Sequence, residues 1–329
     1  MPRTPTPLPG PWPDSAPGST ARTAEAARAG ITRNMLAHRR FESPHRGVHR
    51  LWSEQQEPRF PEQRVLDLAR AYVPKLRRGE AFSHTTALLA FGAPIRSPEV
   101  VHLAAPLPLR AARGRTVVGH GVGSDFEVVL SPAGLPCVRP VAALAQSAAL
   151  LPLRELVVAM DHLVLPRGPR HRVTPLVPLE ALHAEVARAS GRGVRKLRAA
   201  LSLTRIGAES RMETEVRLEL VALGLDDLDL QVELRRADGT FIGRFDLVDR
   251  ARRRIIEYDG EQHRTDRAQY LKDLARIEAA REEGYRLLRL HREDLLRSRI
   301  TETRARLCRF LDREPRPIMA ELARLLAER

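Results

Sequence analysis

Carboxylates with strand-like spacing stand on two neighbouring segments in the C-terminal third of the chain. Asp246 lies in the run GTFIGRFDLVD, and Glu257 and Asp259 lie in the run RRRIIEYDG that follows it. Side chains two positions apart share one face of a strand, so Glu257 and Asp259 point the same way. If the two strands pair with these faces together, three carboxylates crowd near the strand ends and cannot all be buried and ionised without a counter-charge.

A divalent cation can supply that counter-charge, and hard oxygen ligands favour Mg²⁺ or Mn²⁺. Such an ion can turn a bound water into a nucleophile and can neutralise the transition state of a phosphate ester. We therefore predict a metal site at Asp246, Glu257 and Asp259. The alternative interpretation is that these acids are solvated charges at strand ends and that EYDG is only a turn.

The elements that must position these acids follow one another in a regular order between residues 207 and 313. Ser210 is a good helix N-cap, and Glu213 three residues later completes the spacing of a capping box. This capping role explains Glu213 as well as a place beside the metal does. Asp238 and Gly239 predict a hairpin turn between two alternating segments. The predicted order is helix, three strands, helix, strand and helix, over residues 209–225, 227–234, 239–249, 252–260, 265–284, 285–290 and 292–311.

This arrangement of acids and elements is similar to a known family. Asp246, ten intervening residues and the run EYDGEQH at 257–263 resemble the PD-(D/E)XK nuclease superfamily, and most closely its very-short-patch-repair-like endonuclease branch. The element order αβββαβ resembles that core, as do Glu213 on the first helix and the run DLAR at 273–276. The resemblance covers residues 209–313 and implies a restriction-endonuclease-like fold with endonuclease activity.

One position departs from the superfamily pattern. Where the superfamily carries its lysine this chain has Asp259, which leaves the group that activates water open. His263 is our candidate, as general base or phosphate contact, and Lys272 is the alternative. Gln262 is a candidate contact to water or to the scissile phosphate. The catalytic set that the resemblance implies is Asp246, Glu257, Asp259, His263, Glu213 and Gln262.

Residues 21–58 form a basic segment with two short helices and a strand. TAEAARAG predicts an Ala-rich helix closed by Gly30, ITRNMLAHRRF predicts a second helix capped by Thr32, and HRGVHRL predicts a short alternating strand. This order is typical of a winged helix-turn-helix, and the alternative is a helical hairpin with a solvated basic face. The candidate DNA contacts are the polar positions of the second helix: Arg33, Asn34, His38, Arg39 and Arg40.

Two further runs follow this segment, SHTTALLAFGAP and PVAALAQSAALLPLRELVVAMDH. Together with residues 21–58 they loosely resemble the type IV antitoxin family of abortive-infection systems, in which a winged helix precedes a domain of helices and strands. The resemblance implies DNA binding by the second helix, and it equally fits a docking platform or a homodimer. We expect the middle domain over residues 59–175 and a helical connector over residues 176–206.

Three histidines, His84, His102 and His120, are scattered through the middle region and invite a metal hypothesis. No pair has the spacing of ligands on a helix with a carboxylate beside it, so we expect satisfied or surface histidines. Residues 1–20 contain seven prolines and are predicted to be a disordered arm, in which Trp12 is a solvated tail residue. Residues 314–329 are predicted to add a C-terminal helix.

The formal net charge of +14 suggests a polyanionic partner such as DNA. Lysine occurs only three times, so 52 of the 55 basic residues are arginine, and part of the charge reflects a GC-rich codon choice. The two cysteines lie far apart and predict neither a disulfide framework nor a CxxC zinc site. The chain has no apolar run of membrane-spanning length and no signal-peptide pattern, so we expect a cytoplasmic protein.

These observations predict an α/β (α+β) protein with a winged helix-turn-helix, a mixed helical and strand middle domain and a restriction-endonuclease-like αβββαβ core. The predicted function is a Mg²⁺- or Mn²⁺-dependent endonuclease that hydrolyses DNA phosphodiester bonds and is positioned by its N-terminal domain. Two alternatives stay open. One is a non-catalytic DNA-binding regulator of antitoxin type with a degenerate nuclease fold, and the other is an RNA-processing or repair nuclease.

Overall fold

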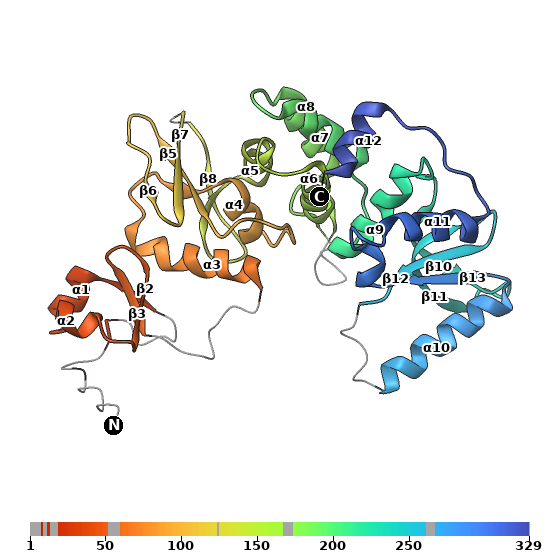
Figure 1. Cartoon of the computed structure of the whole chain (residues 1–329), viewed down its shortest axis with the longest axis horizontal. Helices are drawn as coiled ribbons and strands as arrows, with labels where there is room; N and C mark the ends of the chain where they lie inside the picture. Colours follow the sequence, from red (N-terminus) through yellow and green to blue (C-terminus); the bar gives the residue numbers. More distant parts are fainter. Residues whose placement is uncertain are drawn as a thin grey trace. The chain divides into compact units, whose positions relative to one another are not determined.

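The computed structural model describes residues 8, 12–13, 19–51, 60–123, 125–166, 174–260 and 267–328. The protein is mixed α/β, and its chain divides into two compact units, residues 1–147 and 148–329 (Figure 1). This division falls inside the segment 59–175, because the helix after Pro152 packs with later helices of the second unit. Within the described part of the chain, no helix is long and apolar enough to cross a membrane. Both cysteines are free thiols, as predicted.

The N-terminal unit begins with a small sheet and two short helices: β1 (Thr20–Arg22), α1 (Thr23–Arg28), α2 (Arg33–Leu36), β2 (Phe41–His45) and β3 (Val48–Leu51). The strand order is β1-β3-β2, so the segment predicted as one strand is a hairpin. It turns at Gly47, whose φ of +76° is a conformation that glycine adopts readily. Thr32 caps α2 as predicted, through a hydroxyl that accepts a hydrogen bond from the N–H of Met35. The helix ends at Leu36, earlier than predicted.

Trp12 belongs to the core of this small sheet. Its indole Nε1 donates to the carbonyl of Ser19 at 3.1 Å, and its ring centroid lies 5.4 Å from that of Phe41. Only 8% of the residue is exposed, because it packs in an apolar cluster with Ile31 and Leu36. The expectation of a solvated tail residue is therefore wrong for Trp12.

A six-stranded mixed sheet forms the rest of this unit, in the order β6-β7-β5-β4-β9-β8. Its strands are β4 (Ala81–Phe82), β5 (Val101–Pro106), β6 (Arg113–Gly114), β7 (Val117–Val122), β8 (Val128–Leu130) and β9 (Pro136–Val138). The helices of this region are α3 (Pro61–Tyr72), which a 3₁₀ turn (Val73–Lys75) follows, α4 (His84–Ala90) and α5 (Pro140–Ser147). β5 and β7 run parallel, with His102 opposite Val118 and Ala104 opposite His120.

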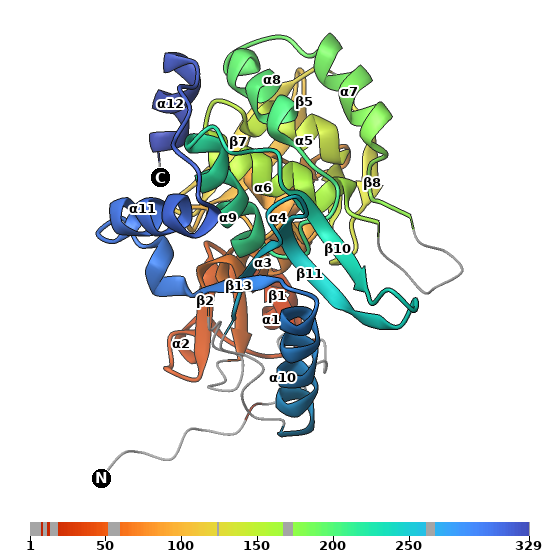
Figure 2. The same cartoon turned by 90° about the vertical axis from the view of Figure 1, so that its right-hand side faces the viewer.

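The C-terminal unit contains a four-stranded sheet with helices on both faces. In order, its strands are β10 (Asp229–Arg235), β11 (Phe241–Asp249), β12 (Arg254–Tyr258) and β13 (Arg286–Leu290). The first three are antiparallel neighbours, and β12 and β13 are parallel. β10 and β11 form one long hairpin (Figure 2). The helices that cover the sheet are α9 (Arg211–Ala222), α10 (Arg267–Glu282) and α11 (Ile300–Leu311), and a 3₁₀ turn (Arg292–Leu295) precedes α11.

Two apolar clusters hold these layers together. On one face, Val216 and Leu220 of α9 pack with Leu247 and Ile256 of the sheet and with side chains of α11. On the other face, Phe245 and its neighbours in the sheet pack with α10. The order helix, three strands, helix, strand and helix is the predicted one.

Four more helices complete the unit: α6 (Leu153–Val164), α7 (Leu179–Arg188), α8 (Val194–Leu203) and α12 (Ala320–Ala327). Buried ion pairs join α6 to the other side of α9. Arg217 donates to Asp161 at 2.6 Å, and Arg154 pairs with Glu219 at 2.8 Å. All four side chains are less than 9% exposed, so α9 is held from both sides. This matters for the candidate site because α9 carries Glu213.

Candidate functional site

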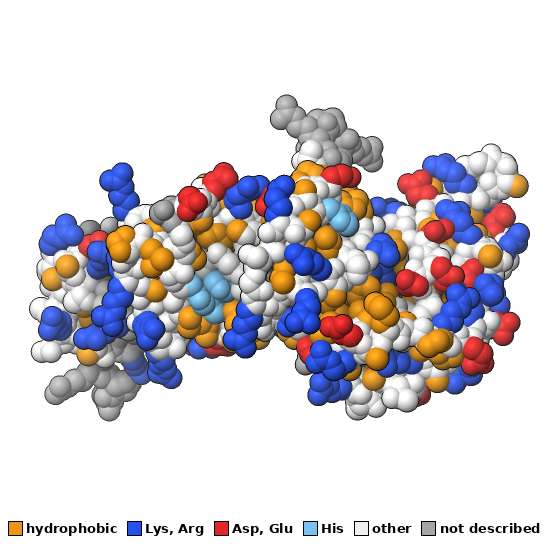
Figure 3. Space-filling view, turned by 90° about the horizontal axis from the view of Figure 1, so that it is seen from above, with side chains coloured by type: hydrophobic (Ala, Val, Ile, Leu, Met, Phe, Trp, Pro, Cys, Tyr) orange, Lys and Arg blue, Asp and Glu red, His pale blue; other side chains and the backbone are white. Residues whose placement is uncertain are grey.

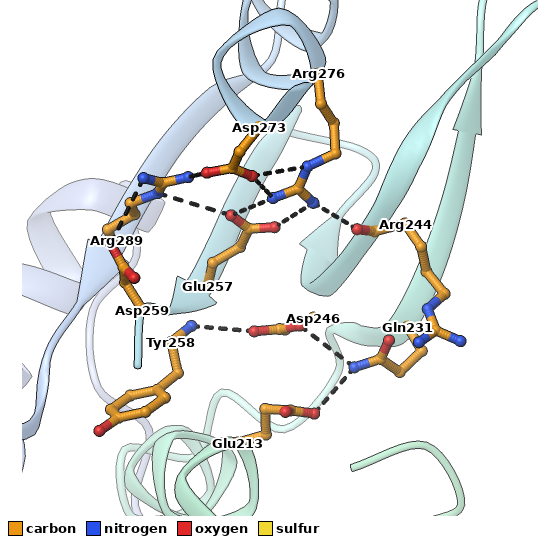
Figure 4. A network of polar contacts seen from close by, with 10 residues as sticks. All are labelled: Glu213, Gln231, Arg244, Asp246, Glu257, Tyr258, Asp259, Asp273, Arg276 and Arg289. Atoms are coloured by element: carbon orange, nitrogen blue, oxygen red, sulfur yellow. Dashed lines mark hydrogen bonds and ion pairs between the residues drawn. The ribbon is translucent and has the colours of Figure 1, made fainter. Parts of the chain in front are cut away.

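Asp246 and Glu257 face each other across two antiparallel strands. Val248 lies opposite Ile255 and Leu247 lies opposite Ile256, so one step further along the same register places Asp246 opposite Glu257. The N–H of Tyr258 donates to Oδ2 of Asp246 at 3.0 Å, which fixes the Asp246 carboxylate beside β12 (Figure 4). The two strands therefore pair with their acid-bearing faces together, which is the condition on which the predicted metal site depended.

Glu213 lies in the first turn of α9 and points toward Asp246. Its N–H donates to the hydroxyl of Ser210, the N-cap residue, at 3.2 Å, and its Oε2 accepts from the N–H of Glu209, just before the cap, at 2.8 Å. Burial, followed by the negative charge of Asp246, raises the pKa of Glu213 to about 7. The capping role and the place beside Asp246 are therefore compatible with each other.

Gln231 bridges these two carboxylates. Its Nε2 donates to Oε2 of Glu213 at 3.0 Å and to Oδ1 of Asp246 at 3.3 Å (Figure 4). The backbone of Gln231 has φ of +50°, in the left-handed region that costs a residue with a side chain about 1–3 kcal/mol. Sequence reasoning missed Gln231, because it is an ordinary polar position of an alternating strand until the pairing with β11 is known.

Glu257 is neutralised by an arginine. Nη1 of Arg276 donates to Oε1 of Glu257 at 2.7 Å, and Nη2 donates to Oε2 at 3.1 Å. Arg276 also donates to Oδ1 of Asp273 at 2.6 Å, and its guanidinium lies 4.6 Å from the centroid of the Phe245 ring. Burial raises the pKa of Glu257, and the charge of Arg276 opposes that effect. The run DLAR at 273–276 is part of the resemblance, but this contact could not be read from it.

Arg289 links the remaining acids. It pairs with Oδ2 of Asp259 at 3.5 Å and with Oε2 of Glu257 at 3.9 Å, and it donates a close hydrogen bond to Asp273. Arg289 thus lies between Glu257 and Asp259, which the sequence suggested as metal ligands (Figure 4). Asp259 directly follows the end of β12 and contacts the cluster through Arg289.

Within this cluster, Glu213 and Asp246 suit a divalent cation better than Glu257 does. Glu213 and Asp246 share only the amide of Gln231, and the charge of Asp246 helps to raise the pKa of Glu213, an effect that a cation would relieve. Both carboxylate oxygens of Glu257 already accept hydrogen bonds from Arg276. Asp246, Glu257 and Asp259 do not form a group with mutually close ligand atoms. Among the described residues, the one such group of three or more side chains is His84, His102 and His120.

Two residues of the predicted catalytic set, Gln262 and His263, lie outside the described residues. Lys272, the alternative to His263, is exposed on α10.

The predicted DNA contacts do not all lie on a helix. Arg33 and Asn34 are exposed on α2, whereas His38, Arg39 and Arg40 follow its end. Nδ1 of His38 accepts from the N–H of Arg40 at 3.2 Å, and the Arg40 guanidinium lies 5.2 Å from the Phe41 ring centroid. The expectation of a single recognition helix that carries all five is therefore wrong, because α2 is one turn long.

A basic cleft in the same unit was not predicted. It has a volume of about 810 Å³ and lies between the small sheet, α3 and the β6–β7 region. The cations that line it are Arg46, Arg50, Arg64, Lys75, Arg113 and Arg115. Some of them are neutralised, since Arg50 donates to both Glu42 and Asp67. Arginine is also widespread on the surface, as the blue side chains on the face drawn in Figure 3 show.

No family model matches this chain, and a comparison with curated proteins found no match.

Proposed function

We propose that the protein is a metal-dependent endonuclease that hydrolyses DNA phosphodiester bonds in its C-terminal unit. The observation that carries the proposal is the position of Asp246, which faces Glu257 across the strands and shares Gln231 with Glu213. Burial raises the pKa of all three carboxyl groups. Buried acids whose pKa values are shifted in one cluster are typical of sites that bind a cation or move protons.

The element order around these acids supports the same proposal. The resemblance to the PD-(D/E)XK superfamily implies an αβββαβ core, and the chain has helix, three strands, helix and strand in that order, with the acids at β11, β12 and α9. We keep Mg²⁺ or Mn²⁺ as the proposed cofactor because the available donors are carboxylate oxygens.

Each residue of the cluster then has a proposed role. Glu213 and Asp246 would hold the metal ion, which when bound supplies Lewis acidity and lowers the pKa of a bound water. Glu257 would join them once Arg276 leaves its carboxylate. Arg276 and Arg289 are then available for a phosphate, whose oxygens match the planar guanidinium. Asp259 orients Arg289, and His263 with Gln262 remains the proposed pair for proton transfer and phosphate contact.

DNA is the proposed partner, contacted by the exposed Arg33, Asn34 and Arg39 of the N-terminal unit. A regulator without catalysis is the second candidate, and one observation favours it. The two-point contact between Arg276 and Glu257 satisfies a buried acid without any metal, which is the arrangement that a degenerate nuclease fold would keep.

Cleavage of defined substrates separates these candidates. The full chain is incubated with supercoiled plasmid, single-stranded DNA and RNA, each with Mg²⁺, Mn²⁺ or EDTA. The proposal expects plasmid or single-stranded DNA to be cleaved with metal and to stay intact with EDTA. Cleavage of RNA alone would support the RNA-processing alternative. Intact substrates under every condition, together with DNA binding, would favour the regulator.

A further inference from the structure

We propose that His84, His102 and His120 form a binding site for a transition-metal ion of the zinc class in the N-terminal unit. The three side chains each offer one ring nitrogen, and these nitrogens all lie within 4.8 Å of one another. From the sequence we expected satisfied or surface histidines here, because no pair has ligand spacing on a helix. Strand pairing nevertheless brings together residues that are 18 positions or more apart in the sequence, which a spacing argument does not foresee.

The sheet explains how the three residues meet. His102 is on β5 and His120 is on β7, and the parallel register places Ala104 opposite His120. His102 and Ala104 share a face of β5, so His102 and His120 are diagonal neighbours on one face of the sheet. His84 opens α4 directly after β4, and the N–H of the preceding Ser83 donates to the carbonyl of His102 at 3.0 Å.

The nitrogen atoms are close to the spacing that a metal requires. Nδ1 of His102 lies 3.0 Å from Nε2 of His120, and the rings of His84 and His120 stack with centroids 3.8 Å apart. Ligands of a tetrahedral zinc ion lie about 2.0–2.1 Å from the metal, which separates their nitrogens by roughly 3.3 Å. The rings must rotate out of this stacked arrangement for all three nitrogens to point at one ion.

His102 and His120 now share one hydrogen bond, so one of the two facing nitrogens carries its proton. If that nitrogen is Nδ1 of His102, metal binding requires the tautomer in which the proton sits on Nε2 of the same ring. The net number of protons on the three rings does not change in this step.

Two independent features of His84 also point to a site. Its φ is +50°, a left-handed conformation that is uncommon for a residue with a side chain and that tends to be kept where a function requires it. Its Nδ1 lies 3.0 Å from the hydroxyl of the fully buried Ser83. A partner on one ring nitrogen is how metal-ligating histidines are oriented, and it leaves Nε2 of His84 for the ion.

The donor set determines the class of metal. Three neutral imidazoles with no carboxylate among them suit Zn²⁺, Co²⁺, Ni²⁺ or Cu²⁺ and do not suit Mg²⁺. A site with three histidines leaves a fourth position for water or for another ligand. His84 and His102 are buried and His120 is partly exposed, which gives the ion a way in from solvent. Figure 3 shows histidine side chains, in pale blue, at the molecular surface.

The test is a titration of the full chain, produced without a histidine tag and stripped of metal with a chelator. Co²⁺ is added while the visible absorption of the bound ion is recorded, and Zn²⁺ then competes for the same site. We expect one equivalent of Co²⁺ with absorption typical of nitrogen ligands, displaced by one equivalent of Zn²⁺. Zn²⁺ should also raise the melting temperature, because it binds only the folded protein.

Substitutions identify the side chains that bind the ion. His102→Ala and His120→Ala should each weaken binding by more than about 100-fold, and Ser83→Ala should weaken it by about 10–100-fold as the loss of an orienting partner does. His183→Ala, which removes an exposed histidine of α7, should bind like wild type. Asp246→Asn should still bind one equivalent of Co²⁺, which distinguishes the histidine site from the acidic cluster. Circular dichroism confirms that each variant is folded.

A wild-type chain that binds no Co²⁺ or Zn²⁺ would overturn the proposal whatever the variants do. Unchanged binding in folded His102→Ala and His120→Ala proteins would overturn it as well, since the ion would then lie elsewhere. The nuclease activity is not needed for any of these measurements, so failure here leaves the proposed function untouched.

Discussion

Arg276 holds both carboxylate oxygens of Glu257, from Nη1 to Oε1 at 2.7 Å and from Nη2 to Oε2 at 3.1 Å. Only 6% of Glu257 is exposed, so the pair lies largely out of water. A buried acid in this setting needs a counter-charge while it is ionised. We propose that the guanidinium of Arg276 neutralises Glu257 while no metal is bound, and that the metal ion replaces it on binding.

Arg276→Met tests this exchange through stability. Without metal the variant leaves Glu257 buried with only the longer contact to Arg289, and breaking a buried pair lowers the free energy of unfolding by up to about 3–5 kcal/mol. Mn²⁺ should recover much of the loss, because it supplies the missing positive charge. Urea denaturation with EDTA and with Mn²⁺ measures both effects.

Two matched variants control this experiment. Arg281→Met removes an exposed arginine from the same helix, where the pairing with Glu278 is on the surface, and should change stability by less than about 1 kcal/mol. Arg276→Met with Glu257→Gln removes both charges and should be more stable than Arg276→Met alone. If Mn²⁺ stabilises Arg276→Met no more than it stabilises wild type, the exchange between arginine and metal does not occur.

The pKa of Glu213 predicts a dependence of stability on pH. This carboxyl titrates near 7 in the folded chain against 4.5 in the unfolded chain, so between these values the folded state holds more protons. The contribution of Glu213 to the free energy of unfolding is fully present below pH 4.5 and is lost as the pH rises through 7. Glu213→Gln should therefore raise the free energy of unfolding at pH 8 by about 2 kcal/mol in EDTA, and change it little at pH 4.5.

Thermal or urea unfolding of wild type and Glu213→Gln at the two pH values makes this measurement. Glu233→Gln, at an exposed position of β10, is the matched control. Mn²⁺ should shrink the difference at pH 8, since it favours the ionised wild-type carboxylate. A Glu213→Gln protein that is less stable than wild type at pH 8 would contradict the raised pKa of Glu213 in the folded chain.

Much of this fold follows from the sequence. The alternation of strand residues, the Ser210 cap and the Asp238-Gly239 turn predict the helices and strands of residues 209–311 in the order observed. Alternation assigns Asp246 and Glu257 each to one face of its strand, but whether these faces coincide depends on the pairing of β11 with β12. Local patterns of this kind need no knowledge of distant contacts.

Contacts made across the fold could not be predicted in the same way. Gln231, Arg276 and Arg289 meet the acids only after the four strands and α10 have packed, and each is an ordinary polar residue in its own segment. The histidine cluster likewise depends on the parallel pairing of β5 with β7, whose register no local signal encodes. Trp12 was missed for a related reason, since its partners Phe41 and Ile31 lie far along the chain.

Arg33→Ala with Arg39→Ala tests the proposed DNA contacts. Each phosphate contact that is lost should reduce the magnitude of the slope of log affinity against log salt by about 0.9. The slope of the double variant should therefore be smaller in magnitude by about 2. Fluorescence anisotropy with the full chain and a short duplex, over a range of salt, measures the slope. Arg70→Ala, an exposed arginine on α3, is the control. A double variant with the wild-type slope would place the DNA contacts elsewhere.

His263 and Lys272 are compared through cleavage kinetics. If His263 moves protons, His263→Ala should slow cleavage by about 10²–10⁴-fold and His263→Gln should not restore it, while affinity for metal and DNA stays near wild type. A phosphate contact predicts a milder loss with partial recovery in His263→Gln. Lys272→Ala should be close to wild type. An inactive Lys272→Ala beside an active His263→Ala would reverse the assignment.

The most direct test of the account is the initial rate at which the chain nicks supercoiled plasmid in Mn²⁺, measured for wild type and for Asp246→Asn. Asp226→Asn, at an exposed position before β10, is the matched control. We expect metal-dependent nicking by wild type and Asp226→Asn, and a rate at least about 100-fold lower for Asp246→Asn. Nicking by Asp246→Asn at the wild-type rate, or none by wild type with any metal, would contradict a nuclease site at Asp246.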